Sequence, residues 1–227
     1  FKSYFGLPLY IYLFLLTSIL GSMVIIYLFS VNLFLGDFID AIPIFFILFF
    51  TLNFYNARYF MNSYLDITKQ MHVRTIAVVL GIFLNAWLCY LTIQEGLGIF
   101  GLALSVSITM ILIAVFVIIF SLKQIYQSVS MAIMFLLRLL LISSLLTLML
   151  FLFKENNIVL YDLNLPTFMD ITLALMDLGI KLIIFIGSTT LLYSICFYKH
   201  NLYEEILMIA GHIFSKLGNK LGLTLAK

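Results

Sequence analysis

The sequence has very little charge for its length. Only 10% of its 227 residues are charged, whereas 64% are hydrophobic, and its mean hydropathy is +1.20. A water-soluble domain of this size would not stay in solution with so few charged side chains, so soluble classes of protein are excluded. The sequence therefore predicts an all-α integral membrane protein. The formal net charge of +2 implies no acidic or basic partner and no nucleic acid.

Residues that bind metals or form disulfides are also scarce. The two cysteines, Cys89 and Cys196, both fall inside apolar runs, where neither a disulfide nor a ligand pair is expected. The three histidines, His72, His200 and His212, fall in segments predicted to be cytoplasmic and share no ligand spacing, which argues against a metal site. We therefore predict no metal and no cofactor.

Six apolar runs are each about as long as the roughly 20 residues that a helix needs to cross a bilayer. We predict six transmembrane helices, at Leu9–Ser30, Ala41–Phe60, Thr75–Ile93, Leu97–Leu122, Met131–Phe153 and Leu178–Tyr198. The second helix is expected to project past the membrane, because the stretch that follows it mixes Tyr, Asn, Asp and Lys. Pro43 suits the first turn of that helix.

Basic residues gather in alternate gaps between these runs. Nine of the 12 Lys and Arg residues fall on one side of the predicted topology: Lys2, Arg58, Lys69, Arg74, Lys123, Lys199, Lys216, Lys220 and Lys227. By the positive-inside rule this side is cytoplasmic, and both ends of the chain lie there. The chain begins at Phe1 without an initiator Met, which we interpret as a fragment of a longer protein.

The most informative stretch is the hairpin between the third and fourth runs. Leu84-Asn85 lies at the middle of the third run, and Gly98-Ile99-Phe100-Gly101-Leu102-Ala103-Leu104-Ser105 opens the fourth. Gly98 and Gly101 are expected to supply backbone freedom at the turn.

This pattern resembles the polysaccharide-flippase branch of the multidrug/oligosaccharidyl-lipid/polysaccharide (MOP) exporter superfamily, in which a Leu-Asn pair precedes Gly-Ile-x-Gly-Ala-Ala and a small hydroxylated residue. Leu102 stands where the family prefers Ala, and Asp66-Ile67-Thr68-Lys69 replaces its usual Gly-Lys. The resemblance covers roughly the first 125 residues.

The resemblance implies the C-terminal portion of a two-lobe transporter of about 14 helices in the bacterial cytoplasmic membrane. Residues 1–125 would be the last four helices of the C-terminal lobe, and 126–200 an additional helix pair with an external loop at 154–177. The N-terminal lobe would be missing from this chain. The implied function is flipping of lipid-linked oligosaccharide or polysaccharide precursors by alternating access, with membrane lipids and the lipid-linked sugar as partners.

The segment 201–227 is expected to form an amphipathic helix in the cytoplasmic interface or, alternatively, a helix that docks another subunit or domain. Its apolar residues recur at three- and four-residue spacing: Leu202, Ile206, Ile209, Ile213 and Leu217.

Four polar residues inside the runs are candidates for a substrate path. Arg138 is a cation within a long uncharged stretch, and it either contacts a lipid diphosphate or extends its side chain to phosphates at the membrane surface. Asn85 either forms a hydrogen bond between helices or lines a cavity. Asn53 and Asn56 share a helix face, and they either form a wall of the sugar path or pair with Ser105, Ser107 or Thr109.

Other functions fit the sequence less well. A MOP-superfamily drug or cation exporter would need a coupling carboxylate, and none of the first four runs has a central Asp or Glu. A membrane-embedded glycan-modifying enzyme would need paired acids or a His with an acid at one membrane face, and Asp37 with Asp40 has no such His. Asp177 and Lys181, four residues apart, are interpreted as a structural ion pair and not as an ion-coupling site. We therefore predict a protein without enzymatic activity.

Overall fold

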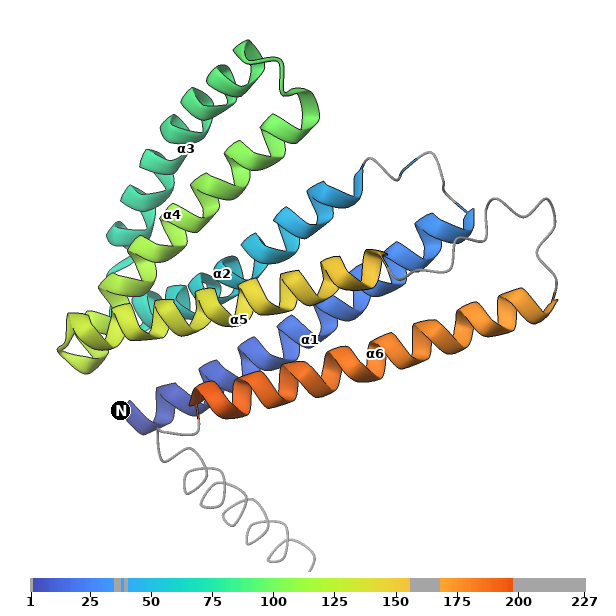
Figure 1. Cartoon of the computed structure of the whole chain (residues 1–227). Coiled ribbons are helices and arrows are strands. Elements are labelled where there is room, and N and C mark those ends of the chain that lie inside the picture. Colours follow the sequence, from blue (N-terminus) through green and yellow to red (C-terminus); the bar gives the residue numbers. More distant parts are fainter. Residues whose placement is uncertain (1, 35–37, 39–40, 156–167, 198–227) are drawn as a thin grey trace, which may run out of the picture.

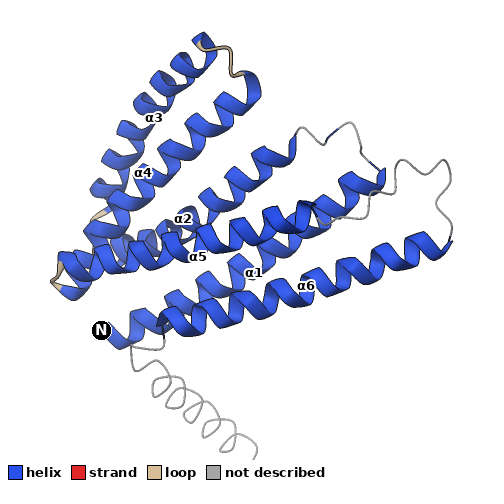
Figure 2. Ribbon diagram, in the orientation of Figure 1, coloured by secondary structure: helices blue, strands red, loops and turns tan. Residues whose placement is uncertain are grey.

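The computed structural model describes residues 2–34, 38, 41–155 and 168–197. These residues form six α-helices and contain no strand: α1 (Lys2–Phe34), α2 (Ile42–Ile67), α3 (Met71–Gln94), α4 (Gly98–Tyr126), α5 (Val129–Glu155) and α6 (Phe168–Phe197) (Figure 2). Each helix is long and apolar enough to cross a membrane. The chain is therefore an all-helical, multi-pass membrane protein, as the sequence predicts.

The helices run alternately up and down, and α1, α2, α5 and α6 pack against one another as a bundle (Figure 1). The hairpin of α3 and α4 leans away from this bundle. In Figure 1, α4 lies close to α2 at the end where α4 is joined to α5. The two helices are far apart at the opposite end, where α3 is joined to α4. Because α3 packs mainly against α4, most of its surface is left outside the core.

The central helix of the bundle is α2, which contacts α1, α3, α4 and α5. Its aromatic side chains also reach α5 and α6, since Phe46 lies edge-on to Phe151 and Phe49 lies edge-on to Phe185. Edge-to-face pairs of this kind are a favoured packing of aromatic rings. The outward faces of α3 and α4 are apolar, as expected for side chains in contact with lipid, and Phe83 is 71% exposed.

The turn between α3 and α4 depends on glycine in two different ways. Gly96 and Gly98 have φ angles of +71° and +54°, which L residues rarely adopt, so the predicted need for backbone freedom is met by Gly98. Gly101 has no such angle. A Cβ placed there would lie 2.8 Å from the Cβ of Thr92, so its role is close approach of the helices.

Two predicted boundaries can be compared with the helices. The expected extension of the second helix is confirmed, because α2 continues to Ile67, and Pro43 lies in its first turn. The predicted external loop at 154–177 is partly wrong, because α6 begins at Phe168, ten residues before the predicted start. The segment 201–227, predicted as an interfacial helix, lies outside the described residues.

Candidate functional site

Asn53 lies in the core at the meeting point of α1, α2 and α6. Its Oδ1 accepts a hydrogen bond of 2.7 Å from the Thr17 hydroxyl, and Thr17 lies 3.0 Å from the Tyr193 hydroxyl. Because Thr17 has one proton and gives it to Asn53, Tyr193 donates to Thr17. The Asn53 Nδ2 donates to the Phe49 carbonyl of its own helix. This network joins three helices, and the predicted partners on α4 are not used by Asn53.

Asn56 is also buried, but its polar atoms are less well paired. Its Nδ2 is enclosed and has no hydrogen-bond partner. The hydroxyls of Ser107 and Thr109 likewise have none, so the predicted pairing of Asn56 with these residues is absent. Ser105 is satisfied differently, by the Gly101 carbonyl and the Thr92 hydroxyl.

Arg58 is the buried cation of α2, and only 8% of it is exposed. Its Nη1 lies 3.9 Å from the Met110 sulfur on α4, and its guanidinium carbon lies 5.9 Å from the centre of the Tyr55 ring. Its Nε has no partner. The ion pairs between described side chains are Arg74–Asp66 and Lys181–Asp177, and neither includes Arg58. Arg58 is thus a buried charge without a carboxylate.

The depth of Arg58 follows from its place on α2. It lies nine residues before Ile67, where this helix ends. At 1.5 Å per residue its Cα is about 14 Å from that end, and its guanidinium lies within electrostatic reach of Arg74 at the turn between α2 and α3. The sequence alone assigns Arg58 to the cytoplasmic gap, whereas the structure places it between two transmembrane helices.

Arg138 lies nine residues after the start of α5. It is half-buried, and its Nη2 lies 3.4 Å from the sulfur of Met134 in the preceding turn. Together with Leu122 and Tyr126, from the last two turns of α4, it lines a cavity of about 20 Å³. That volume holds about one water molecule and not a lipid head group. The position favours the interpretation that Arg138 reaches the membrane surface.

Asn85 is half-buried in α3. Its Oδ1 accepts a weak hydrogen bond from the Cys89 sulfur, 3.7 Å away and one turn along the same helix. No hydrogen bond from Asn85 to another helix is present among the described residues. The groove between α3 and α4, with a volume of about 190 Å³, is lined by apolar side chains and does not include Asn85.

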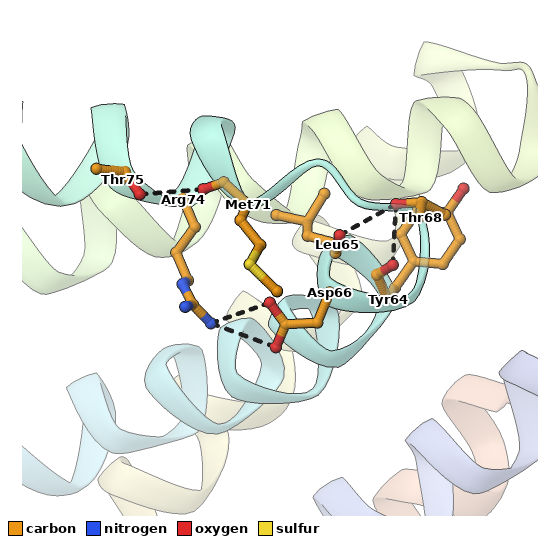
Figure 3. Close-up of polar contacts among 7 residues, drawn as sticks. All are labelled: Tyr64, Leu65, Asp66, Thr68, Met71, Arg74 and Thr75. Atoms are coloured by element: carbon orange, nitrogen blue, oxygen red, sulfur yellow. Dashed lines mark hydrogen bonds and ion pairs between the residues drawn. The ribbon is translucent and has the colours of Figure 1, made fainter.

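The turn between α2 and α3 shows how the other arginine of this region is neutralised. Arg74 donates to both carboxylate oxygens of Asp66, at 3.2 and 3.4 Å, and Thr68 closes the end of α2 by donating to the Tyr64 and Leu65 carbonyls (Figure 3). Both ion-pair partners are partly exposed. This charge is therefore balanced locally, unlike that of Arg58.

The predicted pair of Asp177 and Lys181 is confirmed, with an N–O distance of 2.6 Å. Its effect is to neutralise two charges within α6, and Asp177 lies inside this helix and not at its boundary. No group of three or more potential metal ligands occurs in the part of the chain that the structure describes.

The structure does not bring the four predicted site residues together. Asn53 faces α1 and α6, Asn85 bonds within α3, and Arg138 lies toward the end of the bundle where α4 meets α5. Asn56 and Arg58 are two residues apart, and therefore point to nearly opposite sides of α2, about 160° apart. The residue that sequence reasoning missed is Arg58, because nothing in the local sequence indicates that α4 covers it.

Comparisons with known proteins give no relative for this chain. No protein-family model, no curated protein and no solved structure matches it. Its class, a multi-pass membrane protein of six described helices, therefore rests on the fold.

Proposed function

We propose that this chain is part of a transporter that flips lipid-linked oligosaccharide or polysaccharide precursors across the bacterial cytoplasmic membrane by alternating access. The main support is the polar character of α2. This helix has the lowest hydropathy of the six, although it lies at the centre of the bundle. Polar and ionisable side chains inside membranes are costly and commonly mark the path of a substrate or ion.

The buried polar atoms on α2 are more numerous than the fold requires. The network of Asn53 has a clear role in holding three helices, but Arg58 Nε and Asn62 Oδ1, which share one face of α2, are enclosed without partners. A buried polar group without a partner costs roughly 1–3 kcal/mol. Such groups can form hydrogen bonds with a polar head group in place of the water it loses during its passage. Those bonds would offset the free-energy cost of burying the groups unpaired.

The choice of a lipid-linked sugar as substrate rests on the resemblance of Leu84-Asn85 and Gly98–Ser105 to the flippase pattern. The proposed mechanism needs no covalent chemistry. The head group crosses through a polar path while its lipid tail stays in the bilayer, and a second lobe supplies the opposite wall of the path. The transporter opens alternately to the two sides of the membrane.

Deletion of the gene that encodes this chain tests the proposal. We expect lipid-linked precursors to accumulate in the cytoplasmic membrane and surface polysaccharide to disappear, with both effects reversed by the gene in trans. Sensitivity to cationic drugs should not change. Normal surface polysaccharide together with new drug sensitivity would contradict the flippase proposal and favour a drug exporter.

A further inference from the structure

The hairpin of α3 and α4 is joined to the rest of the protein at one end only. Residues 68–70 connect it to α2 and residues 127–128 connect it to α5, and Figure 1 shows both connections at the end opposite the turn between α3 and α4. Each connection contains one residue with a positive φ, +57° at Lys69 and +55° at Gln127. Hinges in proteins are commonly a few loop or helix-end residues that absorb a change of backbone angle. The two connections are therefore the places about which the hairpin can pivot.

Within the hairpin, α3 and α4 are held closely together. A Cβ placed at Gly81 would overlap the Ile113 side chain, and one placed at Gly101 would lie 2.8 Å from the Cβ of Thr92. The hydroxyls of Thr92 and Ser105 are 3.1 Å apart and form a hydrogen bond between the two helices. Small residues and interhelical hydrogen bonds of this kind hold transmembrane helices together. The hairpin is therefore built to stay intact as one unit.

The contact between α4 and α2 encloses polar groups without satisfying them. The Nη1 of Arg58 meets only the sulfur of Met110 on α4, at 3.9 Å, and its Nε is enclosed without a partner. Ser107 lies one turn before Met110 on the same face of α4, and it is 3% exposed with an unpaired hydroxyl. Enclosed polar groups without hydrogen bonds destabilise the contact that removes them from water.

On its other side, α2 is held by hydrogen bonds that are satisfied. Asn53 accepts from Thr17 of α1, and Thr17 in turn bonds to Tyr193 of α6. The contact with α4 differs also in extent, because α4 and α2 are far apart near the turn between α3 and α4 (Figure 1). Of these contacts of α2, the one with α4 is therefore the one that separates most readily.

We infer that the α3–α4 hairpin is a rigid arm that swings away from α2 about its two connections and admits water to the face of α4 that carries Ser107. Separation hydrates the unpaired groups of Arg58 and Ser107. Lipid tails replace the apolar contacts that α4 loses, since they are as apolar as the side chains. The inference goes beyond the proposed function, because the movement does not depend on what the protein carries.

The rate at which single cysteines react with a charged methanethiosulfonate, which does not enter hydrocarbon, tests the movement. The full-length protein is placed in nanodiscs, with Cys89→Ser and Cys196→Ser removing the native thiols. We expect Ser107→Cys to react at least tenfold faster than Ser105→Cys. Ser105 is the matched control, because it is a buried serine two residues away that bonds to α3 and stays enclosed when the arm moves as one unit. Ser143→Cys, buried in α5, gives the rate for a closed core.

Two results would overturn the inference. Reaction of Ser107→Cys no faster than that of Ser143→Cys would show that α4 does not leave α2. Reaction of Ser105→Cys as fast as that of Ser107→Cys would show that α3 and α4 come apart, so that the hairpin is not a rigid arm. Because neither measurement involves a substrate, failure of the flippase proposal in the gene-deletion experiment would leave the result unchanged.

A distance measurement between spin labels at exposed positions keeps the inference testable if Ser107→Cys does not fold. Ile93 lies at the end of α3 near the turn to α4, Met23 lies on α1 and Ile183 on α6, and each is more than 60% exposed. We expect labels at Ile93→Cys and Met23→Cys to show a broad or two-peaked distance distribution, and labels at Met23→Cys and Ile183→Cys a single narrow one. Equally narrow distributions for both pairs would contradict a moving arm.

Discussion

The hydrogen bond between Thr17 and Asn53 should stabilise the bundle by an amount that a double-mutant cycle can measure. The relevant variants are Thr17→Val, which keeps the shape of the side chain, Asn53→Ala, and the two combined. Thr17 and Asn53 are each only 1% exposed, and their atoms are 2.7 Å apart. Solvent water therefore does not reach the remaining partner to replace the hydrogen bond when the other partner is removed.

The expected magnitude follows from this burial. Each single variant leaves a buried polar group without its partner, which costs about 1–3 kcal/mol. Hydrogen bonds between transmembrane helices couple by about 0.6 kcal/mol on average and about 1.7 kcal/mol at most. Because this bond is short and fully enclosed, we expect a coupling free energy of about 1–1.7 kcal/mol.

The assay is reversible unfolding in mixed micelles with an increasing fraction of denaturing detergent, followed by circular dichroism. Thr190→Val is a suitable control, because the Thr190 hydroxyl is exposed and bonds only to a carbonyl of its own helix. We expect that variant to change the free energy of unfolding by less than about 0.5 kcal/mol. A Thr17–Asn53 coupling near zero would refute the idea that this network holds α1 and α2 together.

Two further predictions concern packing and surface charge. Gly21→Ala should destabilise the protein by about 1–3 kcal/mol through overpacking, because the new Cβ would overlap the buried Phe185 ring. Gly179→Ala, with no atom within 4 Å of the new Cβ, should be neutral or slightly stabilising in the same unfolding assay. Asp66→Asn should cost less than about 1 kcal/mol, and less in high salt, because the ion pair with Arg74 is partly exposed. A large or salt-independent loss would contradict this account of the turn.

Local sequence features predicted much of the fold. The six apolar runs, the place of Pro43, the turn at Gly98 and the pairing of Asp177 with Lys181 all depend on residues within a few positions of one another. The start of α6 was predicted ten residues too late, because Asp177 was taken as a polar boundary. Asp177 instead lies inside the helix and pairs with Lys181, four residues later.

The candidate site was less accessible to prediction, because it depends on which helices meet. Asn53 was expected either to line a sugar path or to pair with hydroxyls on α4, whereas its partner is Thr17, which is 36 positions away. Arg58 was counted among cytoplasmic charges, since the next 16 residues contain Lys69 and Arg74. Only the contact with Met110, 52 positions later, shows that α4 encloses it.

The flippase proposal is tested most directly by translocation in liposomes that contain the full-length protein. Lipid-linked oligosaccharide with a labelled head group is placed in one leaflet, and its appearance in the other is followed with a membrane-impermeant enzyme that cleaves the label. The account predicts translocation by the unmodified protein and by Arg74→Met, and at least tenfold slower translocation by Arg58→Met. Transfer by the unmodified protein no faster than in protein-free liposomes would contradict it.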